Sequence, residues 1–170
     1  MDKAKRKDLL TFLLFIIYVL VVTWIILFKL HFSIAEMDRI RIINLIPFQD
    51  SAIMGANELY NIVFFIPFGI YICMLKSNWV LLKKAIIILC FSLSFEILQF
   101  IFAIGRTDIT DFICNVLGGM IGIGIFKLCY KLLKDRTNRV LNIVLLVLTA
   151  CILLFFALLL THLIPLRFNL

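Results

Sequence analysis

The chain is dominated by five apolar runs, most of them long enough to cross a lipid bilayer as a single helix. A spanning helix needs about 20 mostly apolar residues, and 64% of this chain is hydrophobic, with a mean hydropathy of +1.15. The second run is the shortest and contains Pro67 and Gly69, which a bundle tolerates where a neighbouring helix or a polar side chain satisfies the freed carbonyl. The sequence therefore predicts an all-α, polytopic membrane helix bundle of about five transmembrane helices, at residues 9–30, 59–75, 80–104, 112–133 and 140–164.

The basic residues predict how this bundle is oriented. Lysine and arginine accumulate in the short cytoplasmic loops of membrane proteins. If the N-terminus and the second and fourth connections share one side, that side carries 12 of the 17 basic residues, which places the N-terminus inside. The net charge of +7 then lies in short loops that meet anionic lipid, and no nucleic-acid partner is expected. The residues on this side are Lys3, Lys5, Arg6, Lys7, Lys76, Lys83, Lys84, Lys127, Lys131, Lys134, Arg136 and Arg139.

The length of the chain suits one bundle and no separate soluble domain. We expect a membrane domain at residues 1–135, with four spans and an outer loop at 31–56, followed by an additional C-terminal transmembrane helix at 136–170. The outer loop contains an amphipathic portion, 39–48, which suits a segment in the membrane interface or a re-entrant loop packed against the bundle. All five cysteines fall within predicted spans without a C-x-x-C pair, so we expect them to be small buried hydrophobes.

The fourth predicted span carries a stripe that is polar at its outer end and small further in. Small residues let a neighbouring helix approach closely, so this stripe should face protein and not lipid. Taken alone, Asp108 suits a helix N-cap, and Asp111 suits the first turn, where the helix dipole favours an acid. At about 100° per residue, the stripe comprises Asp108, Asp111, Asn115, Gly118, Gly119 and Gly122.

The third predicted span places a carboxylate deep in the bilayer. Glu96 shares a face with Gln99 and lies about 12 Å below the outer end by helical rise. At this depth it must pair, take up a proton or meet water. Asn61 from the second span and Asn44 from the outer loop add polar groups on the same side, so we predict a closed-bottom pocket that opens outward. Asn61 and Asn115 also suit a purely structural role as interhelical hydrogen-bonding groups.

The spacing of these residues resembles a known signature. Glu96-x-x-Gln99 is followed after six residues by Arg106-x-Asp108-x-x-Asp111-x-x-x-Asn115-x-x-Gly118. Upstream lie Asn44-Leu-Ile-Pro47-Phe48, and Asn61 followed by Phe65-Ile-Pro67-Phe68-Gly69. The combined pattern is similar to that of the VanZ-like family over roughly residues 9–131, and it is specific although no single piece of it is. The last span lies outside the matched motifs.

The resemblance implies a small multi-pass protein of the bacterial cell membrane, especially in Gram-positive species. The founding member of the family is associated with low-level resistance to teicoplanin, a lipoglycopeptide that acts at the outer leaflet on lipid-linked cell-wall precursors. We therefore expect a pocket that binds a lipoglycopeptide, a cell-wall lipid intermediate or another membrane lipid at the outer leaflet. No cofactor is expected, and cell-wall synthesis proteins remain open as partners. The candidate ligand-binding residues are Glu96, Gln99, Arg106, Asp108, Asp111, Asn115, Asn61 and Asn44.

Two other classes of function remain open. An intramembrane enzyme acting on a lipid-linked envelope substrate would use Glu96 as a general acid or base, Arg106 to hold a phosphate, and Asp108 with Asp111 to hold a metal. The sequence contains no nucleophile constellation and no H-E-x-x-H, so we assign no catalytic residue and expect no metal site. A small ion-coupled carrier would use Glu96 as its proton site, but such carriers often contain inverted repeats, and none is found.

Overall fold

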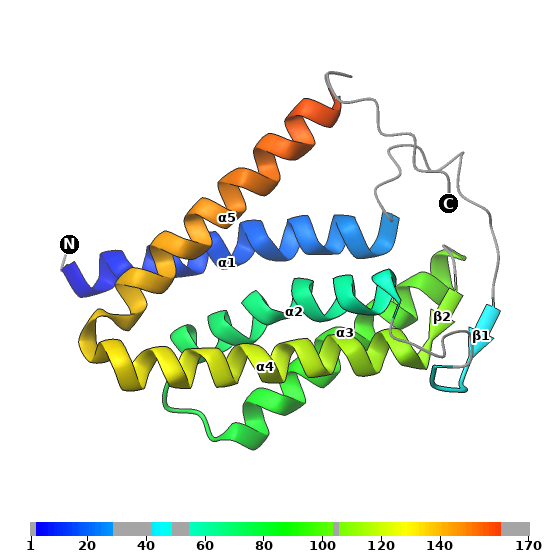
Figure 1. Ribbon diagram of the computed structural model, residues 1–170, viewed down its shortest axis with the longest axis horizontal. Coiled ribbons are helices and arrows are strands. Elements are labelled where there is room, and N and C mark those ends of the chain that lie inside the picture. Colours follow the sequence, from blue (N-terminus) through cyan, green and yellow to red (C-terminus); the bar gives the residue numbers. More distant parts are fainter. Residues whose placement is uncertain (1–2, 29–41, 49–54, 104–105, 161–170) are drawn as a thin grey trace.

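The computed structural model describes residues 3–28, 42–48, 55–103 and 106–160, which form a bundle of helices (Figure 1). The prediction of an all-α fold is confirmed, and two short strands accompany the helices. The helices are α1 (Lys3–Phe28), α2 (Ala56–Leu75), α3 (Leu81–Phe102), α4 (Ile109–Leu133) and α5 (Thr137–Leu160), with a 3-10 turn, η2 (Lys134–Arg136), between the last two. The strands are β1 (Ile42–Asn44) and β2 (Arg106–Asp108).

Four helical segments of the described chain are long and apolar enough to cross a membrane. The last of them, Ile109–Leu154, is 46 residues long because its helical backbone continues through η2. At η2 the chain turns back on itself, so α4 and α5 are separate arms (Figure 1). Each of the five predicted spans therefore corresponds to a helix of the structure.

Apolar side chains cover the outside of the bundle. Leu20 on α1, Leu82 on α3 and Leu128 on α4 are 66%, 69% and 59% exposed. A soluble protein rarely exposes large continuous apolar patches, whereas lipid tails solvate such side chains without cost. The surface therefore agrees with the hydropathy in indicating a membrane protein.

The two ends of the bundle differ in charge and architecture. The start of α1, the α2–α3 connection and η2 lie at one end, and β1 and β2 lie at the other (Figure 1). We call these the basic end and the strand end. The basic end carries lysines and arginines that were predicted to lie inside, Lys76, Lys134 and Arg136 among them. The arrangement fits the predicted orientation, in which the strand end faces outward.

Glycines bring α2 and α4 into direct backbone contact. A Cβ added at Gly118 would lie 2.9 Å from the Cα of Ile62, and one added at Gly69 would lie 2.9 Å from the carbonyl carbon of Gly119. Both distances are shorter than ordinary van der Waals contact, so only glycine fits at this separation. Asn115, Gly118, Gly119 and Gly122 are buried, which confirms that the polar and small stripe of α4 faces protein.

Aromatic rings fill the space between α1, α2 and α3. The rings of Phe68 and Phe91 stack with centroids 4.2 Å apart. Tyr18 from α1 donates a hydrogen bond to the carbonyl of Phe64 at 2.6 Å, in the turn of α2 that precedes Pro67. Pro67 lacks the N–H that would bond the carbonyl of Val63, yet α2 continues to Leu75, and the Tyr18 bond attaches α1 to α2 in the same turn.

The last helix attaches to the first through a buried polar pair. Thr11 on α1 donates to Asn142 on α5 at 3.1 Å, and Asn142 donates back to Thr11 at 2.8 Å. Leu141 and Leu145 are buried beside this pair. Beyond it α5 diverges from the bundle (Figure 1). In the described chain, α5 is therefore attached to α1 mainly toward the basic end.

The cysteines only partly match their predicted burial. All five are free; Cys73 and Cys114 are buried, and Cys129 is half-buried. Cys90 and Cys151 are exposed, so the prediction that they pack inside the bundle is wrong. Cys90 lines an open groove beside α1 and α2, and hydrophobicity alone does not reveal which apolar positions of a helix stay exposed.

Candidate functional site

Two short strands join the outer loop to the strand end of the bundle. β1 pairs with β2 in parallel, and the register places Asn44 opposite Asp108. The sequence leaves open whether residues 39–48 lie in the membrane interface or pack against the bundle. Residues 42–48 are held to the bundle by strand pairing and hydrogen bonds, while Ile43, Leu45 and Ile46 stay exposed; a place in the interface stays a prediction, and 39–41 lie outside the described residues. This pairing brings Asn44 to the start of α4, a partner 64 residues away in sequence.

Asp108 is the junction of the hydrogen-bond network at this end. Its Oδ1 accepts the backbone N–H of Thr110 at 2.9 Å, which confirms the predicted N-cap of α4. Its Oδ2 accepts from the Nδ2 of Asn44 at 3.0 Å, and its own backbone N–H donates to the Oε2 of Glu96 at 3.0 Å. One residue thus connects the outer loop, α3 and α4.

Glu96 is buried, with 6% of its side chain exposed. Besides the bond from Asp108, its backbone carbonyl accepts from the hydroxyl of Thr107 at 3.4 Å. A buried carboxylate is stable only when paired or hydrogen-bonded, and a backbone N–H is a strong donor to it. Of the three predicted possibilities for Glu96, the structure shows pairing with the peptide backbone of β2; its depth in a bilayer stays a prediction.

Asp111 links α4 to α2. Its Oδ1 accepts from the Nδ2 of Asn61 at 2.7 Å. As an acid in the first turn of α4 it also meets the partial positive charge of the helix N-terminus. The two predicted site residues are therefore in direct contact, across a separation of 50 residues.

Thr110 takes part in the site although no sequence pattern singles it out. It is buried, and its hydroxyl accepts the backbone N–H of Phe48 at 3.0 Å. The backbone N–H of Ile46 donates to the Oδ1 of Asn44 at 3.2 Å. Together these bonds fix residues 44–48 against the start of α4. A threonine two positions after an N-cap is common, so no sequence signal distinguishes this one.

Two buried amide oxygens at the strand end have no hydrogen-bond partner among the described residues. Gln99 is 3% exposed; its Nε2 donates to the carbonyl of Ile26 at 3.3 Å, but its Oε1 is unpaired. Asn115 is 1% exposed, and its Oδ1 is also unpaired. A buried acceptor without a donor costs about 1–3 kcal/mol, so these two atoms are unusual features of the site.

The remaining predicted residue, Arg106, is placed only in part. Its backbone belongs to β2 and pairs with Ile42. Its side chain lies outside the described part of the structure, so its predicted contact with a headgroup remains a prediction.

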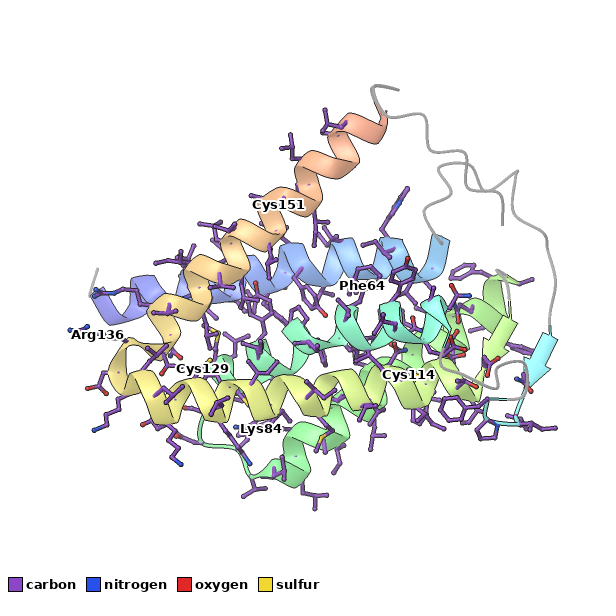
Figure 2. All side chains as sticks on the ribbon, in the orientation of Figure 1. Phe64, Lys84, Cys114, Cys129, Arg136 and Cys151 are labelled. Carbon is purple, nitrogen blue, oxygen red and sulfur yellow. The ribbon has the colours of Figure 1, made fainter. Side chains whose placement is uncertain are left out.

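The chemistry of the site is that of a polar, acidic cluster. Figure 2 shows side-chain oxygen atoms gathered beside β1 and β2, near Cys114, whereas Arg136 lies at the opposite end. Within the described residues, no group of three or more His, Cys, Asp and Glu side chains is arranged to hold a metal ion. We define the acidic cluster as Glu58, which lies in the first turn of α2, together with Glu96, Asp108 and Asp111.

A separate apolar groove of about 500 Å³ lies deeper in the bundle. It runs between α1, α2 and α3 and is open to the surface that lipid would cover. Its walls are formed by side chains of Phe15, Ile16, Val19, Phe68, Ile87, Cys90, Phe91 and Ser94. The groove and the polar cluster therefore share α2 and α3, at different depths.

Comparison with known proteins places the chain in a family. Residues 15–134 match the family model described as VanZ/LLP1, which takes in α2, α3, α4 and every candidate site residue. The chain is 39% identical over 139 residues to Protein VanZ of Enterococcus faecium, covering 78% of this chain and 85% of that protein. No solved structure matches it. The chain is therefore a helical membrane protein that belongs to the VanZ/LLP1 family.

Proposed function

We propose that this protein lowers susceptibility to lipoglycopeptide antibiotics such as teicoplanin by binding an amphiphile at the strand end of the bundle. In this proposal it is a multi-pass protein of the bacterial cell membrane, and the strand end faces outward. The ligand is the antibiotic itself, a cell-wall lipid intermediate or another envelope lipid. Membership of the VanZ/LLP1 family and the similarity to Protein VanZ support the proposal.

The observation that carries the proposal is the hydrogen-bond network at the strand end. Asn44 bonds Asp108, Asp108 bonds Glu96, and Asn61 bonds Asp111. These residues come from the outer loop and three helices, and they converge on one end of an otherwise apolar bundle. Polar residues inside a membrane are costly and are kept mainly where they have a function.

The apolar groove supports an amphiphile as the ligand. A lipoglycopeptide or a lipid carries a polar head and an acyl tail. The acidic cluster offers hydrogen-bond acceptors for the head, and the groove between α1, α2 and α3 offers an apolar space of about 500 Å³ for a tail. Phe91 and Ser94 on α3 line the groove, and Glu96 lies at the following turn.

A pair of inhibitory-concentration series tests the proposal. A susceptible Gram-positive host would express wild type, Asp111→Asn or Glu96→Gln at matched membrane levels, and growth would be measured in teicoplanin and in vancomycin. Asp111→Asn removes a charge but retains an oxygen that accepts from Asn61, so the bundle should still assemble. We expect wild type to protect against teicoplanin alone and both variants to lose that protection.

The matched control for this assay is Asp135→Asn, which makes the same chemical change at an exposed residue of the basic end. It should protect as well as wild type. Protection that survives in Asp111→Asn and Glu96→Gln would show that the carboxylates have no part in it, and equal loss in Asp135→Asn would point to a general effect of charge.

A further inference from the structure

Lys84 is the one basic residue among the buried side chains of the described chain, with 8% of it exposed. It lies in the first turn of α3, and its Nζ donates to the backbone carbonyl of Ser77 at 3.4 Å. Within the described residues this carbonyl is its one oxygen partner, and no carboxylate forms an ion pair with it. A buried ammonium is costly unless its charge and its three N–H donors are compensated. One long hydrogen bond leaves most of that requirement open.

The acidic residues of the basic end do not meet this requirement. Asp135 on η2 is exposed, and it forms no ion pair with a described residue. The side chain of Asp8 lies outside the described part of the structure, but Asp8 belongs to α1, and Figure 2 shows Lys84 on the side of α4 that is remote from α1. The compensation of the Lys84 charge therefore comes from water or from a bound anion.

A second lysine acts at the same place. Lys84 and Lys127, which is exposed on α4, both interact electrostatically with the thiol of Cys73. Cys73 is buried in the last turn of α2, so α2, α3 and α4 all contribute to this part of the basic end. Two positive charges around one buried side chain repel each other, and an anion between them would turn that repulsion into attraction.

The start of α3 adds partial positive charge to the same place. Its N-cap is Val80, whose side chain accepts no hydrogen bond, and its first turn contains no acidic residue. The N–H groups of a first helical turn have no acceptor within the helix and favour an anion. Because Lys84 reaches back to Ser77 in the connection before α3, its ammonium lies at this helix start. The buried lysine and the uncapped helix start are thus two independent features that favour the same kind of ligand.

We propose that the basic end contains a second binding site, in which Lys84 pairs with a phosphate group and Lys127 adds charge from the neighbouring helix. Lysine binds phosphate as a point charge, and basic pockets between helices on the cytoplasmic side of a membrane hold lipid phosphates. The phosphate belongs either to a lipid headgroup or to a soluble phosphate, and the chemistry of recognition is the same in both. This site is separate from the proposed amphiphile site, which lies at the strand end.

The binding test uses probes that differ in the phosphate alone. Full-length protein in a neutral detergent would be titrated with dioctanoyl phosphatidic acid, with dioctanoylglycerol, which lacks the phosphate, and with sodium phosphate. We expect a phosphate-bearing probe to bind at least about tenfold more tightly than dioctanoylglycerol, because a charge-assisted hydrogen bond is lost without the phosphate. Binding of sodium phosphate as tightly as phosphatidic acid would identify a soluble ligand, and binding of phosphatidic acid alone would identify a lipid.

The variant Lys84→Gln removes the charge but keeps an N–H donor for the carbonyl of Ser77. It should weaken binding of the phosphate-bearing probe by about tenfold or more and leave dioctanoylglycerol unaffected. Its Tm without ligand should equal or exceed that of wild type, because a buried charge without a carboxylate partner has been removed. The matched control is Lys83→Gln, which makes the same change at the exposed neighbouring position of α3 and should bind the probe as wild type does.

The remaining outcomes would overturn the inference. If no phosphate-bearing probe binds more tightly than dioctanoylglycerol, water compensates the charge of Lys84. An equal loss of affinity in Lys83→Gln would indicate diffuse attraction to a basic surface and not a site. Unchanged affinity in Lys84→Gln, or failure of both Lys84→Gln and Lys84→Met to assemble, would assign Lys84 to the structure of the bundle.

Discussion

Replacing Gly122 by alanine should force α2 and α4 apart, whereas the same change at Gly124 should not. A Cβ at Gly122 would press on the carbonyl oxygen of Ile66, and would lie 3.0 Å from that carbonyl carbon and 3.1 Å from the Cα of Gly69. Ordinary contacts of a Cβ begin at 3.4 Å, and the backbone cannot rotate out of the way as a side chain can. A Cβ at Gly124 would meet no described atom within 4 Å.

The size of the effect follows from opposing terms. Forcing an extra methyl group into a tight contact costs about 1–3 kcal/mol. If α2 and α4 move apart by about 0.5–1 Å instead, they lose roughly a quarter to a half of the van der Waals attraction between them. Alanine regains up to about 1 kcal/mol through its higher helix propensity. We therefore expect Gly122→Ala to lower the free energy of unfolding by roughly 1–2 kcal/mol, and Gly124→Ala to raise it by up to about 1 kcal/mol.

Thermal unfolding of the two purified variants in the same detergent measures this difference. A difference of about 1–3 kcal/mol between the two variants corresponds to roughly 2–12 °C in Tm for a chain of this size. Tryptophan fluorescence is a suitable signal, because neither substitution involves a tryptophan. If Gly122→Ala and Gly124→Ala shift Tm by the same amount, the direct backbone contact between α2 and α4 is not what holds them together.

Two further predictions concern polar contacts. Thr11→Val leaves Asn142 buried without its partner and should lower the free energy of unfolding by about 1–3 kcal/mol. Adding Asn142→Leu should restore part of this loss. If the two effects are strictly additive in a double-mutant cycle, the pair is not the link between α1 and α5. Asn44→Asp places a second carboxylate against Asp108, where the amide now lies at 3.0 Å, so residues 42–48 should separate from α4. Hydrogen exchange at the amide of Phe48 should then accelerate, and unchanged protection would contradict the prediction.

The helices and the buried face of α4 could be predicted because each follows from a local pattern. Apolar runs locate each of the five α-helices in the described part of the chain, and helical periodicity groups Asn115 with Gly118 and Gly122. The helix starts were less accurate. The second apolar run starts at 59, whereas α2 begins at Ala56, because polar residues in a first turn are helical without being apolar; for α4 the apolar run starts at 112, but the capping pattern at Asp108 correctly predicts a start at Ile109.

Contacts between distant segments could not be predicted in the same way. The three-residue pairing of β1 with β2 has no periodic signal, and it alone brings Asn44 to Asp108. The same holds for Thr110, whose role depends on the path of the outer loop. Sequence alone identified Asn61 and Asp111 as polar neighbours of the site, but their contact at 2.7 Å depends on the glycine-mediated approach of α2 to α4.

Photo-crosslinking from the strand end tests the proposed binding site most directly. Phe48, which is exposed and bonded to Thr110 through its backbone, would be replaced by benzoylphenylalanine; Tyr130, an exposed aromatic near the basic end, would be replaced as the matched control. Membranes would be irradiated with teicoplanin and the protein analysed by mass spectrometry. We expect a teicoplanin adduct from position 48, none from position 130, and loss of the adduct when Asp111→Asn is added. An equal yield from both positions, or an adduct only at position 130, would contradict a binding site at the strand end.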